Sequence, residues 1–392
     1  AGLYPQGKGE KGGWQIVKIL HICCNLAGST VFPQMFESLN KAALEQIVFV
    51  PERRAKDMHK NEPKGVPTIY RMTVKATDML FFFRKAQRTV PVIRRDVDLS
   101  DVTLIHAHTL FTDGSIARSL AQKTGLPYMV TLRYSDIAAI WKYEPHLRPM
   151  ARRILKDAKK VVCLSGAAKD AVLGWFKGAA RDELAQKMEI IPNGIDPAWL
   201  DGKPKTAPHE PVRVGFAGLL NPRKRPLDAI TAVHRANEKQ SGRFIARVCG
   251  DGPLKEAVCA AMKPEDSYLG RISGMDAMKR FYADCDVLLV PSSAETFGMV
   301  YLEAMSQGVP VLYTKGQGFD GQFPEGEVGF SVPCGDTAAQ ADALCRVMED
   351  YSARSARCVE RAREYAWERI ARKWMKVYGE TAVALDPSPK GN

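Results

Sequence analysis

The sequence predicts an α/β protein built from two Rossmann-like domains, and three observations support this. Short apolar runs, typical of buried parallel strands, alternate along the chain with segments of helical pattern. A stretch rich in Pro, Gly, Lys and Asp interrupts the alternation at residues 196–211, and the alternation then restarts. The chain of 392 residues is long enough for two domains of ordinary size. We therefore expect an N-terminal domain at residues 14–197 and a C-terminal domain at residues 198–367.

The N-terminal domain should alternate strands with helices. We expect strands at residues 15–23, 47–50, 102–106, 128–132, 161–164 and 189–191, and helices at residues 31–44, 114–123, 152–160 and 166–176. After the first strand, the small residues of NLAGST form a loop in which Gly28 would let a phosphate or an acceptor approach the backbone. One glycine is not the GxGxxG fingerprint of a dinucleotide site. Residues 1–13 are rich in Gly and Lys and are left out of the fold.

The segment HAHTLFTDG follows the strand expected at residues 102–106. His106 and His108 are two residues apart, so they share a face if the strand continues. A metal site would need further ligands, and the neighbouring sequence offers none. His108, at the carboxyl end of the strand, is placed to hydrogen-bond a ligand, although a structural histidine satisfied inside the protein fits equally well. Arg133, after the next strand, could meet an anion or pair with Asp136.

The C-terminal domain repeats the alternation. We expect strands at residues 212–217, 244–249, 268–272, 287–290 and 309–313, and helices at residues 227–237, 275–285, 297–306, 338–350 and 353–382, with a further helix after GDGP. The first strand is followed by the loop GLLNPRKR, in which Arg223 and Lys224 lie just ahead of a helix. A helix start favours anions, so these two cations predict a diphosphate clamp. The alternative is a solvated basic loop.

Residues 286–314 form a strand–loop–helix–strand unit around which the domain is organised. The loop lies at the carboxyl end of a strand, where open α/β sheets bind ligands. The first backbone amides of the helix would form an anion site, and Gly298 would allow a close approach. Those amides belong to Phe297, Gly298, Met299 and Val300.

Glu295 and Glu303 flank this helix start. Carboxylates bind phosphate poorly but accept hydrogen bonds from sugar hydroxyls, so the loop suits a ligand that is part phosphate and part polyol, such as a nucleotide sugar. An ordinary βαβ unit with Thr296 as N-cap and two solvated glutamates would show the same pattern.

The composition points to a globular protein of a reducing compartment. The nine cysteines are odd in number and form no CxxC pair, which argues against a disulfide framework and a zinc site. No stretch approaches the roughly 20 apolar residues of a membrane span. Two DxD sequences, at residues 96–98 and 284–286, precede or begin strands and are interpreted as structural. We expect a cytoplasmic protein with no essential metal and no cofactor.

The net charge of +12 is concentrated in the first half of the chain. Residues 53–95 contain 12 Lys and Arg against three Asp and Glu, and in residues 80–95 aromatic and basic side chains are neighbours. This composition suits an anionic membrane surface or an acidic lipid-linked substrate. A nucleic-acid surface, or a solvated helix whose phenylalanines face the core, would have the same composition.

Five segments in order now indicate a family: HAHTLFTDG, IIPNGID, FAGLLNPRK, GDGP and the glutamate pair of ETFGMVYLE. Through them the chain resembles the retaining glycosyltransferases of family 4 over nearly its whole length. The resemblance implies the GT-B fold, in which two Rossmann-like domains face each other across a cleft. It also implies that the last helix, at about residues 368–385, packs back on the first domain.

The resemblance implies a role for each site residue. His108, Glu295 and Lys224 would form the catalytic set. His108 would contact the donor sugar near the reacting carbon, Glu295 its hydroxyls, and Lys224 the diphosphate, with Gly28 nearby. The remaining donor contacts would be Glu303 to the ribose, the amides of Phe297, Gly298, Met299 and Val300 to the sugar or distal phosphate, Arg223 beside Lys224, and Leu269 and Arg271 to the base.

The chain departs from the family pattern at three places. Leu219 stands where arginine is usual, Ala27 precedes Gly28 where two glycines are usual, and Arg133 stands where histidine is common. These departures concern donor geometry and acceptor choice more than the class of reaction.

The expected function is transfer of a sugar from a UDP- or GDP-linked donor to an acceptor hydroxyl, with retention of configuration. The acceptor would be a lipid or lipid-linked glycan of cell-envelope polysaccharide or glycolipid synthesis, met at the inner face of the cytoplasmic membrane by residues 53–95. The alternatives are a sugar-nucleotide epimerase or phosphorylase of the same fold, and a nucleic-acid binder, although we expect no nucleic acid.

Overall fold

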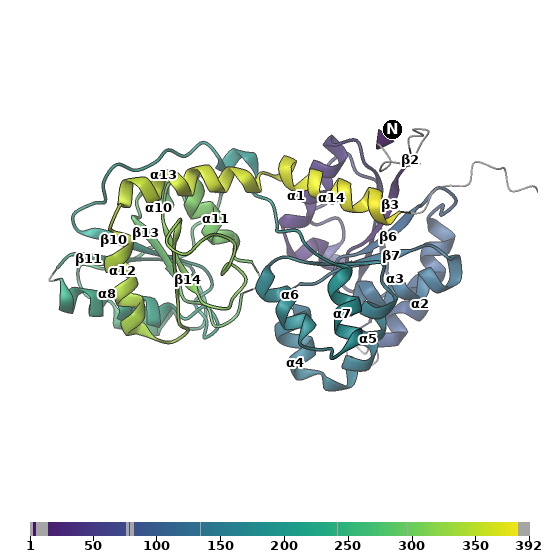
Figure 1. Cartoon of the computed structure of the whole chain (residues 1–392), viewed down its shortest axis with the longest axis horizontal. Helices are drawn as coiled ribbons and strands as arrows, with labels where there is room; N and C mark the ends of the chain where they lie inside the picture. Colours follow the sequence, from purple (N-terminus) through teal and green to yellow (C-terminus); the bar gives the residue numbers. More distant parts are fainter. Residues whose placement is uncertain are drawn as a thin grey trace, which may run out of the picture. The chain divides into compact units, whose positions relative to one another are not determined.

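The computed structural model of the protein describes residues 3–4, 15–75, 78, 82–133, 135–240, 242–295 and 297–382 (Figure 1). The chain forms two compact units. Unit 1 lies within Ala1–Leu164, Lys169–Gly194 and Trp367–Asn392, and unit 2 within Ser165–Ala168 and Ile195–Ala366. Each unit carries one parallel sheet covered by helices, which confirms the predicted α/β class with two Rossmann-like units.

Unit 1 is organised around a seven-stranded sheet of order β5-β4-β3-β6-β7-β8-β9, in which all neighbours are parallel. A short antiparallel pair, β1 and β2, precedes it. The strands are β1 (Leu3–Tyr4), β2 (Gln15–Ile16), β3 (Lys18–Ile22), β4 (Glu45–Glu52), β5 (Thr68–Met72), β6 (Leu104–Ala107), β7 (Tyr128–Thr131), β8 (Lys160–Cys163) and β9 (Met188–Ile190). The helices are α1 (Val31–Lys41), α2 (Phe82–Asp96), α3 (Thr112–Thr124), α4 (Trp141–Tyr143), α5 (Arg148–Asp157), α6 (Gly166–Leu173), α7 (Ala179–Gln186) and α14 (Trp367–Thr381). The first turn of α6 is assigned to unit 2 and the rest of the helix to unit 1.

Unit 2 has a six-stranded parallel sheet of order β12-β11-β10-β13-β14-β15. Its strands are β10 (Val212–Ala217), β11 (Phe244–Cys249), β12 (Ser267–Tyr268), β13 (Val287–Val290), β14 (Val311–Thr314) and β15 (Gly329–Val332). Its helices are α8 (Pro226–Lys239), α9 (Lys255–Ala261), α10 (Met275–Ala283), α11 (Met299–Ser306), α12 (Thr337–Val347) and α13 (Tyr351–Ala362).

Both sheets reverse their strand order at one point. In unit 1 the chain builds β3, β4 and β5 outward and then returns to place β6 on the other side of β3. In unit 2 the same reversal lies between β10 and β13. Loops that leave the carboxyl ends of two strands at such a reversal diverge and leave a crevice, where α/β proteins bind ligands. The fold therefore predicts a ligand site at one pair of loops in each unit: the loops after β3 and β6 in unit 1, and the loops after β10 and β13 in unit 2.

The last helix, α14, belongs to the core of unit 1 and lies beside α1 (Figure 1). Trp374 and Tyr378 are fully buried and share one apolar cluster with Ile19 and Leu39. The prediction of one continuous helix at residues 353–382 was wrong. A 3-10 turn at Arg363–Tyr365 and the extended backbone of Ala366 separate α13, in unit 2, from α14, in unit 1.

Other elements also differ from the prediction. The helix predicted to begin at residue 297 begins at Met299, because Gly298 has a left-handed backbone with a φ of 86°. The edge strands β5 and β15 and the helix α7 were not predicted. Among the described residues, no helix is long and apolar enough to cross a membrane.

Candidate active site

Lys224 and Glu295 form an ion pair in unit 2. They come from the loops after β10 and β13, the two strands at the sheet reversal. The backbone holds both residues in place: Lys224 N donates to Asn221 Oδ1 at 2.9 Å, and Glu295 N donates to Gln317 Oε1 at 2.9 Å. Their side chains are only 12% and 13% exposed. An ammonium and a carboxylate therefore meet, largely shielded from water, at the sheet reversal, the position at which α/β proteins bind ligands.

Arg223, the other cation of the predicted clamp, lies against the same loop. Its Nη1 donates to the carbonyl of Ala294 at 3.2 Å, and its own carbonyl accepts from Ser293 N at 2.8 Å. These contacts join the loops after β10 and β13. The structure thus brings Arg223, Lys224 and Glu295 together.

Gly298 serves a packing purpose that the sequence did not reveal. A Cβ at Gly298 would lie 2.5 Å from the ring of Tyr301, whose hydroxyl donates to the carbonyl of Val290 at 2.7 Å. The ring therefore occupies the space that a side chain would need, and the glycine is required by the protein itself. Phe297 is buried, with 2% exposure, and Met299 and Val300 begin α11. Thr296, the expected N-cap, lies outside the described residues.

Glu303, on α11, is held by a residue that the sequence analysis missed. Its Oε2 accepts a hydrogen bond from the Tyr282 hydroxyl at 2.9 Å. Burial raises the pKa of Glu303, while the hydrogen bond from Tyr282 favours the charged form and lowers it. Tyr282 lies on α10 and has no exposed surface. Its hydroxyl fixes the orientation of the carboxylate, and no sequence motif connects the two residues.

A pocket of about 520 Å³ lies beside the loop after β10. It is formed by the loop after β10, the GDGP loop, the segment after β12 and the helices α10 and α11; the lining residues are Ala217, Gly218, Leu219, Cys249, Gly250, Asp251, Gly252, Arg271, Ile272, Met278 and Val300. A Cβ at Gly250 would lie 1.8 Å from the carbonyl oxygen of Gly218, so the two loops touch backbone to backbone. Of the two residues expected to hold a base, Arg271 lines this pocket, and Leu269 is 39% exposed without lining it.

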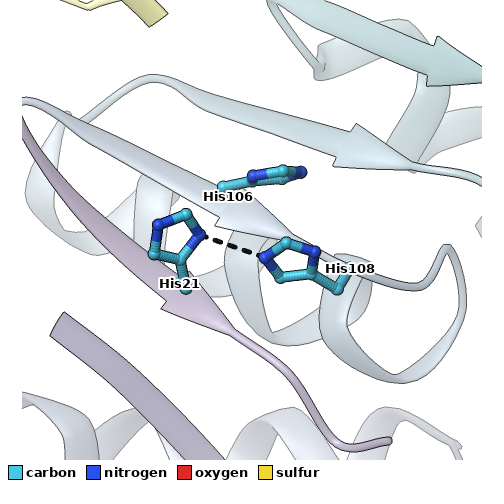
Figure 2. Close-up of side chains that lie close together, drawn as sticks. All are labelled: His21, His106 and His108. Atoms are coloured by element: carbon cyan, nitrogen blue, oxygen red, sulfur yellow. Dashed lines mark hydrogen bonds between the residues drawn. The ribbon is translucent and has the colours of Figure 1, made fainter. Parts of the chain in front are cut away.

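In unit 1, His108 lies in a cluster with His21 and His106 (Figure 2). His21 Nδ1 and His108 Nε2 are 3.0 Å apart and share a hydrogen bond. His21 comes from β3, beside His106 in the neighbouring strand β6. The expectation that no further ligand lies near His106 and His108 was therefore wrong, because the parallel pairing of β3 with β6 brings His21 to them.

These three histidines are neutral and fully buried. Burial lowers the pKa of all three, that of His21 to about 3. Within the described part of the chain, they are the only three His, Cys, Asp or Glu side chains close enough to share a metal ion. His106 already uses both ring nitrogens, with the Tyr378 hydroxyl and the Thr131 hydroxyl each at 2.8 Å. We interpret the cluster as a hydrogen-bonded network that fixes the His108 ring.

Around the cluster, Arg133, Asp136 and Asp113 are hydrogen-bonded to protein groups. Asp136 Oδ2 accepts from Arg133 N at 2.9 Å, and Arg133 Nη1 donates to Asn193 Oδ1 at 3.0 Å. Asp113 Oδ1 accepts from Cys24 N at 3.0 Å. Burial raises the pKa of Asp113 to about 7 and that of Asp136 to about 6. Of the two partners considered for Arg133, an anion or Asp136, the structure shows a backbone bond to Asp136 and a side-chain bond to Asn193.

The loop that carries Gly28 borders a second pocket, of about 410 Å³, in unit 1. Its lining includes Arg53, Arg54, Lys60, Lys75 and Lys85. These residues belong to the basic stretch that the sequence suggested as a surface. The strands β4 and β5 end at the same edge of the sheet, and this gathers the cations around one hollow.

The carboxylates of both DxD sequences have protein partners. Asp96 pairs with Arg71 and Arg95, and Asp98 accepts from Ser100 N. Asp284 pairs with Arg213 and Arg247, and Asp286 bonds His209 and the backbone of Arg213. These contacts agree with the structural interpretation of both sequences.

Known proteins share this architecture. Residues 30–199 match the family described as "Glycosyltransferase Family 4", and residues 199–365 match "Glycosyl transferases group 1". A phosphatidyl-myo-inositol mannosyltransferase of Mycobacterium leprae is 32% identical over 273 residues, which cover 61% of this chain and 72% of that protein.

Two solved structures have the same fold. Sucrose-phosphate synthase of Thermosynechococcus elongatus has a TM-score of 0.73 at 19% identity and covers 93% of this chain and 98% of its own. Anabaena HepE in complex with UDP has a TM-score of 0.72 at 17% identity, with 93% and 100% covered. The chain belongs to the family 4 glycosyltransferases, and its fold is that of the GT-B enzymes.

Proposed function

We propose that this glycosyltransferase moves a sugar from a nucleoside diphosphate donor to an acceptor hydroxyl with retention of the anomeric configuration. One observation carries the proposal: the Lys224–Glu295 ion pair at the sheet reversal of unit 2, beside a pocket of about 520 Å³. An ammonium suits the diphosphate, and a carboxylate beside it suits the sugar hydroxyls. HepE, solved with UDP, has the same fold, which supports a UDP-linked donor.

The proposed reaction is a front-face displacement. The bond between the anomeric carbon and the diphosphate oxygen breaks, and the acceptor oxygen bonds to that carbon from the same side. The leaving diphosphate oxygen takes the acceptor proton. Lys224, with the amides at the start of α11, would stabilise the negative charge that develops on the diphosphate, so the protein itself supplies positive charge. His108 would contact the sugar only after its covering side chains move, because it has no exposed surface.

We further propose that the acceptor is a lipid or a lipid-linked glycan, reached at the cytoplasmic face of a membrane. The relative from M. leprae is by its name a phosphatidyl-myo-inositol mannosyltransferase, which supports a lipid acceptor. Unit 1 also has basic and aromatic surfaces. Phe83, on α2, is 53% exposed, and Trp141 stacks on Trp175 at 3.8 Å, with Arg148 and Arg152 over the Trp141 ring. Residues 76, 77 and 79–81 of the expected stretch lie outside the described residues.

The donor part is tested by incubating the protein with UDP- and GDP-sugars and measuring nucleoside diphosphate release with and without acceptor lipids. We expect release that depends on the acceptor, and a product with the donor's anomeric configuration. Conversion of the donor sugar without acceptor would instead indicate an epimerase. The membrane part is tested by flotation with vesicles of phosphatidylcholine, with and without phosphatidylglycerol. Equal flotation in both would contradict it.

A further inference from the structure

Both backbone groups of Glu295 are bonded to the loop that follows β14, residues 315–322, which we call the β14 loop. Glu295 N donates to the side-chain oxygen of Gln317, Oε1, at 2.9 Å, and Glu295 O accepts from Gly318 N at 2.8 Å. The peptide groups on both sides of the Glu295 Cα therefore have partners on one loop. This fixes the position from which the carboxylate extends.

The β14 loop has a folded shape of its own. Gly316 N donates to Asp320 Oδ2 at 2.7 Å, and Asp320 N donates to Gln317 O at 2.9 Å. Phe319 anchors the loop, since its side chain is 1% exposed and its ring centroid lies 4.7 Å from that of Tyr301. Gln317 therefore offers its acceptor oxygen to Glu295 from a fixed base.

Tyr365 holds the other end of this loop. Its hydroxyl donates to Gln322 Oε1 at 3.1 Å, and Gln322 Nε2 donates to Gly318 O at 3.2 Å. The Tyr365 ring is 7% exposed, and its centroid lies 5.7 Å from that of Phe323 and 6.0 Å from that of Phe297, within the range of aromatic contacts. Phe297 belongs to the loop after β13, so Tyr365 contacts both loops that meet at the glutamate.

Tyr365 lies in a segment that joins the two units. The chain passes from unit 1 to unit 2 between Gly194 and Ile195 and returns between Ala366 and Trp367. Ile195 N donates to Tyr365 O at 2.8 Å, and Ile195 pairs with Ala366 in a parallel bridge. A Cβ at Gly194 would lie 2.4 Å from the Trp367 ring. The two passages therefore run side by side, and Tyr365 belongs to one and is bonded to the other.

The backbone bonds of Glu295 matter most when a donor is bound. The carboxylate pairs with Lys224, and a diphosphate would interact with the same ammonium group. The attraction between Lys224 and Glu295 would then weaken. The bonds from Gln317 and Gly318 do not depend on that charge, so they would keep the glutamate in place.

We propose that Gln317 and Tyr365 are positioning residues for Glu295. The inference rests on the proposed sugar transfer, in which Glu295 contacts the donor sugar, and adds the residues that place this carboxylate. Gln317 holds the glutamate directly, and Tyr365 holds the β14 loop through Gln322. A misplacement of about 1 Å can cost on the order of 100-fold in rate, so bonds one residue removed from the chemistry affect turnover. The placement of Glu295 thereby depends on the segment that joins the units.

The test uses the full chain and the variants Gln317→Met and Tyr365→Phe. Met keeps the length of the Gln side chain without its amide oxygen, and Phe keeps the ring without the hydroxyl. The matched control is Asn237→Leu. Asn237 bonds both backbone groups of Phe244, at 2.7 and 2.8 Å, as the β14 loop does for Glu295. Phe244 begins β11, at the opposite end of the unit 2 sheet from the site.

The first measurement is backbone hydrogen exchange of the ligand-free proteins, read by mass spectrometry. We expect the peptide that contains Glu295 to exchange on the order of fivefold faster or more in both variants, because its amide loses a fixed partner. Asn237→Leu should raise exchange at Phe244 and leave the Glu295 peptide unchanged. Unchanged exchange at Glu295 in both variants would overturn the inference, and faster exchange in Gln317→Met alone would remove Tyr365 from it.

The second measurement separates turnover from nucleotide binding. On the nucleotide sugar that supports transfer, kcat should fall on the order of tenfold in Gln317→Met and in Tyr365→Phe. Affinity for UDP, measured by calorimetry, should stay within about twofold, because Asn221 holds the backbone of Lys224 separately. Asn237→Leu should keep both values.

The double variant Gln317→Met/Tyr365→Phe tests whether the two residues act through one loop. Its kcat should be no lower than that of the weaker single variant, because the second change finds the connection already broken. Losses that multiply, or normal kcat in both single variants, would overturn the inference while leaving sugar transfer intact. An unaltered chain that neither binds UDP nor turns over any nucleotide sugar would instead overturn the proposed function, and hydrogen exchange would still decide whether Gln317 and Tyr365 hold Glu295.

Discussion

The ammonium of Lys224 contacts the carboxylate of Glu295, so the loops after β10 and β13 are joined by charge as well as by backbone hydrogen bonds. The pair is largely shielded, and each residue is fixed at its backbone. A diphosphate beside Lys224 would interact with the same ammonium group as Glu295. The lysine would then neutralise the phosphates while the glutamate stays oriented toward a sugar.

Replacing Lys224 with alanine should cut turnover on the order of 100-fold or more, because charge stabilisation of the leaving group is lost. Replacing Glu295 with glutamine should lower turnover while keeping the size of the side chain. The measurement is initial rate at saturating donor. The control is Lys239→Ala, which breaks an exposed ion pair with Asp342 in the same unit. Near-normal rates in Lys224→Ala would remove this residue from the site.

Replacing Tyr282 with phenylalanine should weaken donor binding on the order of tenfold through Glu303, because a hydrogen bond to a charged group is lost. The hydroxyl favours the charged carboxylate, so its loss should raise the pKa of Glu303. The pH below which protonation of Glu303 weakens donor binding should therefore be higher in the variant.

The control for Tyr282 is Tyr128→Phe, which removes a buried hydrogen bond from Tyr128 to Ile154 O in unit 1. Both variants should lose some stability, but only Tyr282→Phe should change the pH profile of donor affinity. An unchanged profile in Tyr282→Phe would show that this tyrosine only supports the fold.

The central strands could be predicted from the sequence because burial on both faces leaves a continuous apolar run. The bounds expected for Val212–Ala217, Phe244–Cys249 and Val287–Val290 agree with the structure to the residue. The missed strands β5 and β15 lie at sheet edges. In β5 only Tyr70 is buried, so the sequence TIYRM mixes polar and apolar residues and lacks the continuous apolar run of the central strands.

The site could be predicted as separate loops but not as contacts. Lys224 and Glu295 are both expected after strands, yet their ion pair depends on β10 lying beside β13, which periodicity does not show. The bond between His21 and His108 depends in the same way on β3 lying beside β6. The cations of residues 53–95 were recognised from composition alone, and only the folded chain places five of them around one pocket.

The buried histidines should make stability depend on pH. The folded-state pKa of His21 is about 3, below its value of about 6.5 in the unfolded chain, so the unfolded state takes up protons first. His21 therefore contributes to the free energy of unfolding above pH 6.5, and this contribution is lost as the pH falls. The loss between pH 7 and pH 5 is about 2 kcal/mol. Asp113 and Asp136, with raised pKa values, act in the opposite direction over the same range.

The test therefore compares the unaltered chain with variants and asks how much free energy of unfolding each protein loses on acidification. The free energy of unfolding is measured at pH 7 and pH 5 for the unaltered chain and for His21→Leu. The loss on acidification should be smaller in the variant by about 2 kcal/mol. His146, which is exposed on unit 1, provides the control His146→Gln, with no change in the loss. An equal loss in all three proteins would show that His21 does not titrate as a buried neutral group.

Substitutions at Gly298 and Gly28 distinguish a glycine needed for folding from a glycine needed for ligand binding. Gly298 has a φ of 86°, and its Cβ would collide with the Tyr301 ring, so Gly298→Ala should destabilise the protein by about 1–3 kcal/mol. A Cβ at Gly28 meets open space, so Gly28→Ala should leave stability within about 0.5 kcal/mol. If a ligand approaches that backbone, Gly28→Ala should still lower turnover, and this combination is the diagnostic result. Thermal unfolding and initial rates of both variants check it. Full activity in Gly28→Ala would mean that the space beside this loop stays empty during the reaction, because a ligand that occupied this space would clash with the added methyl group.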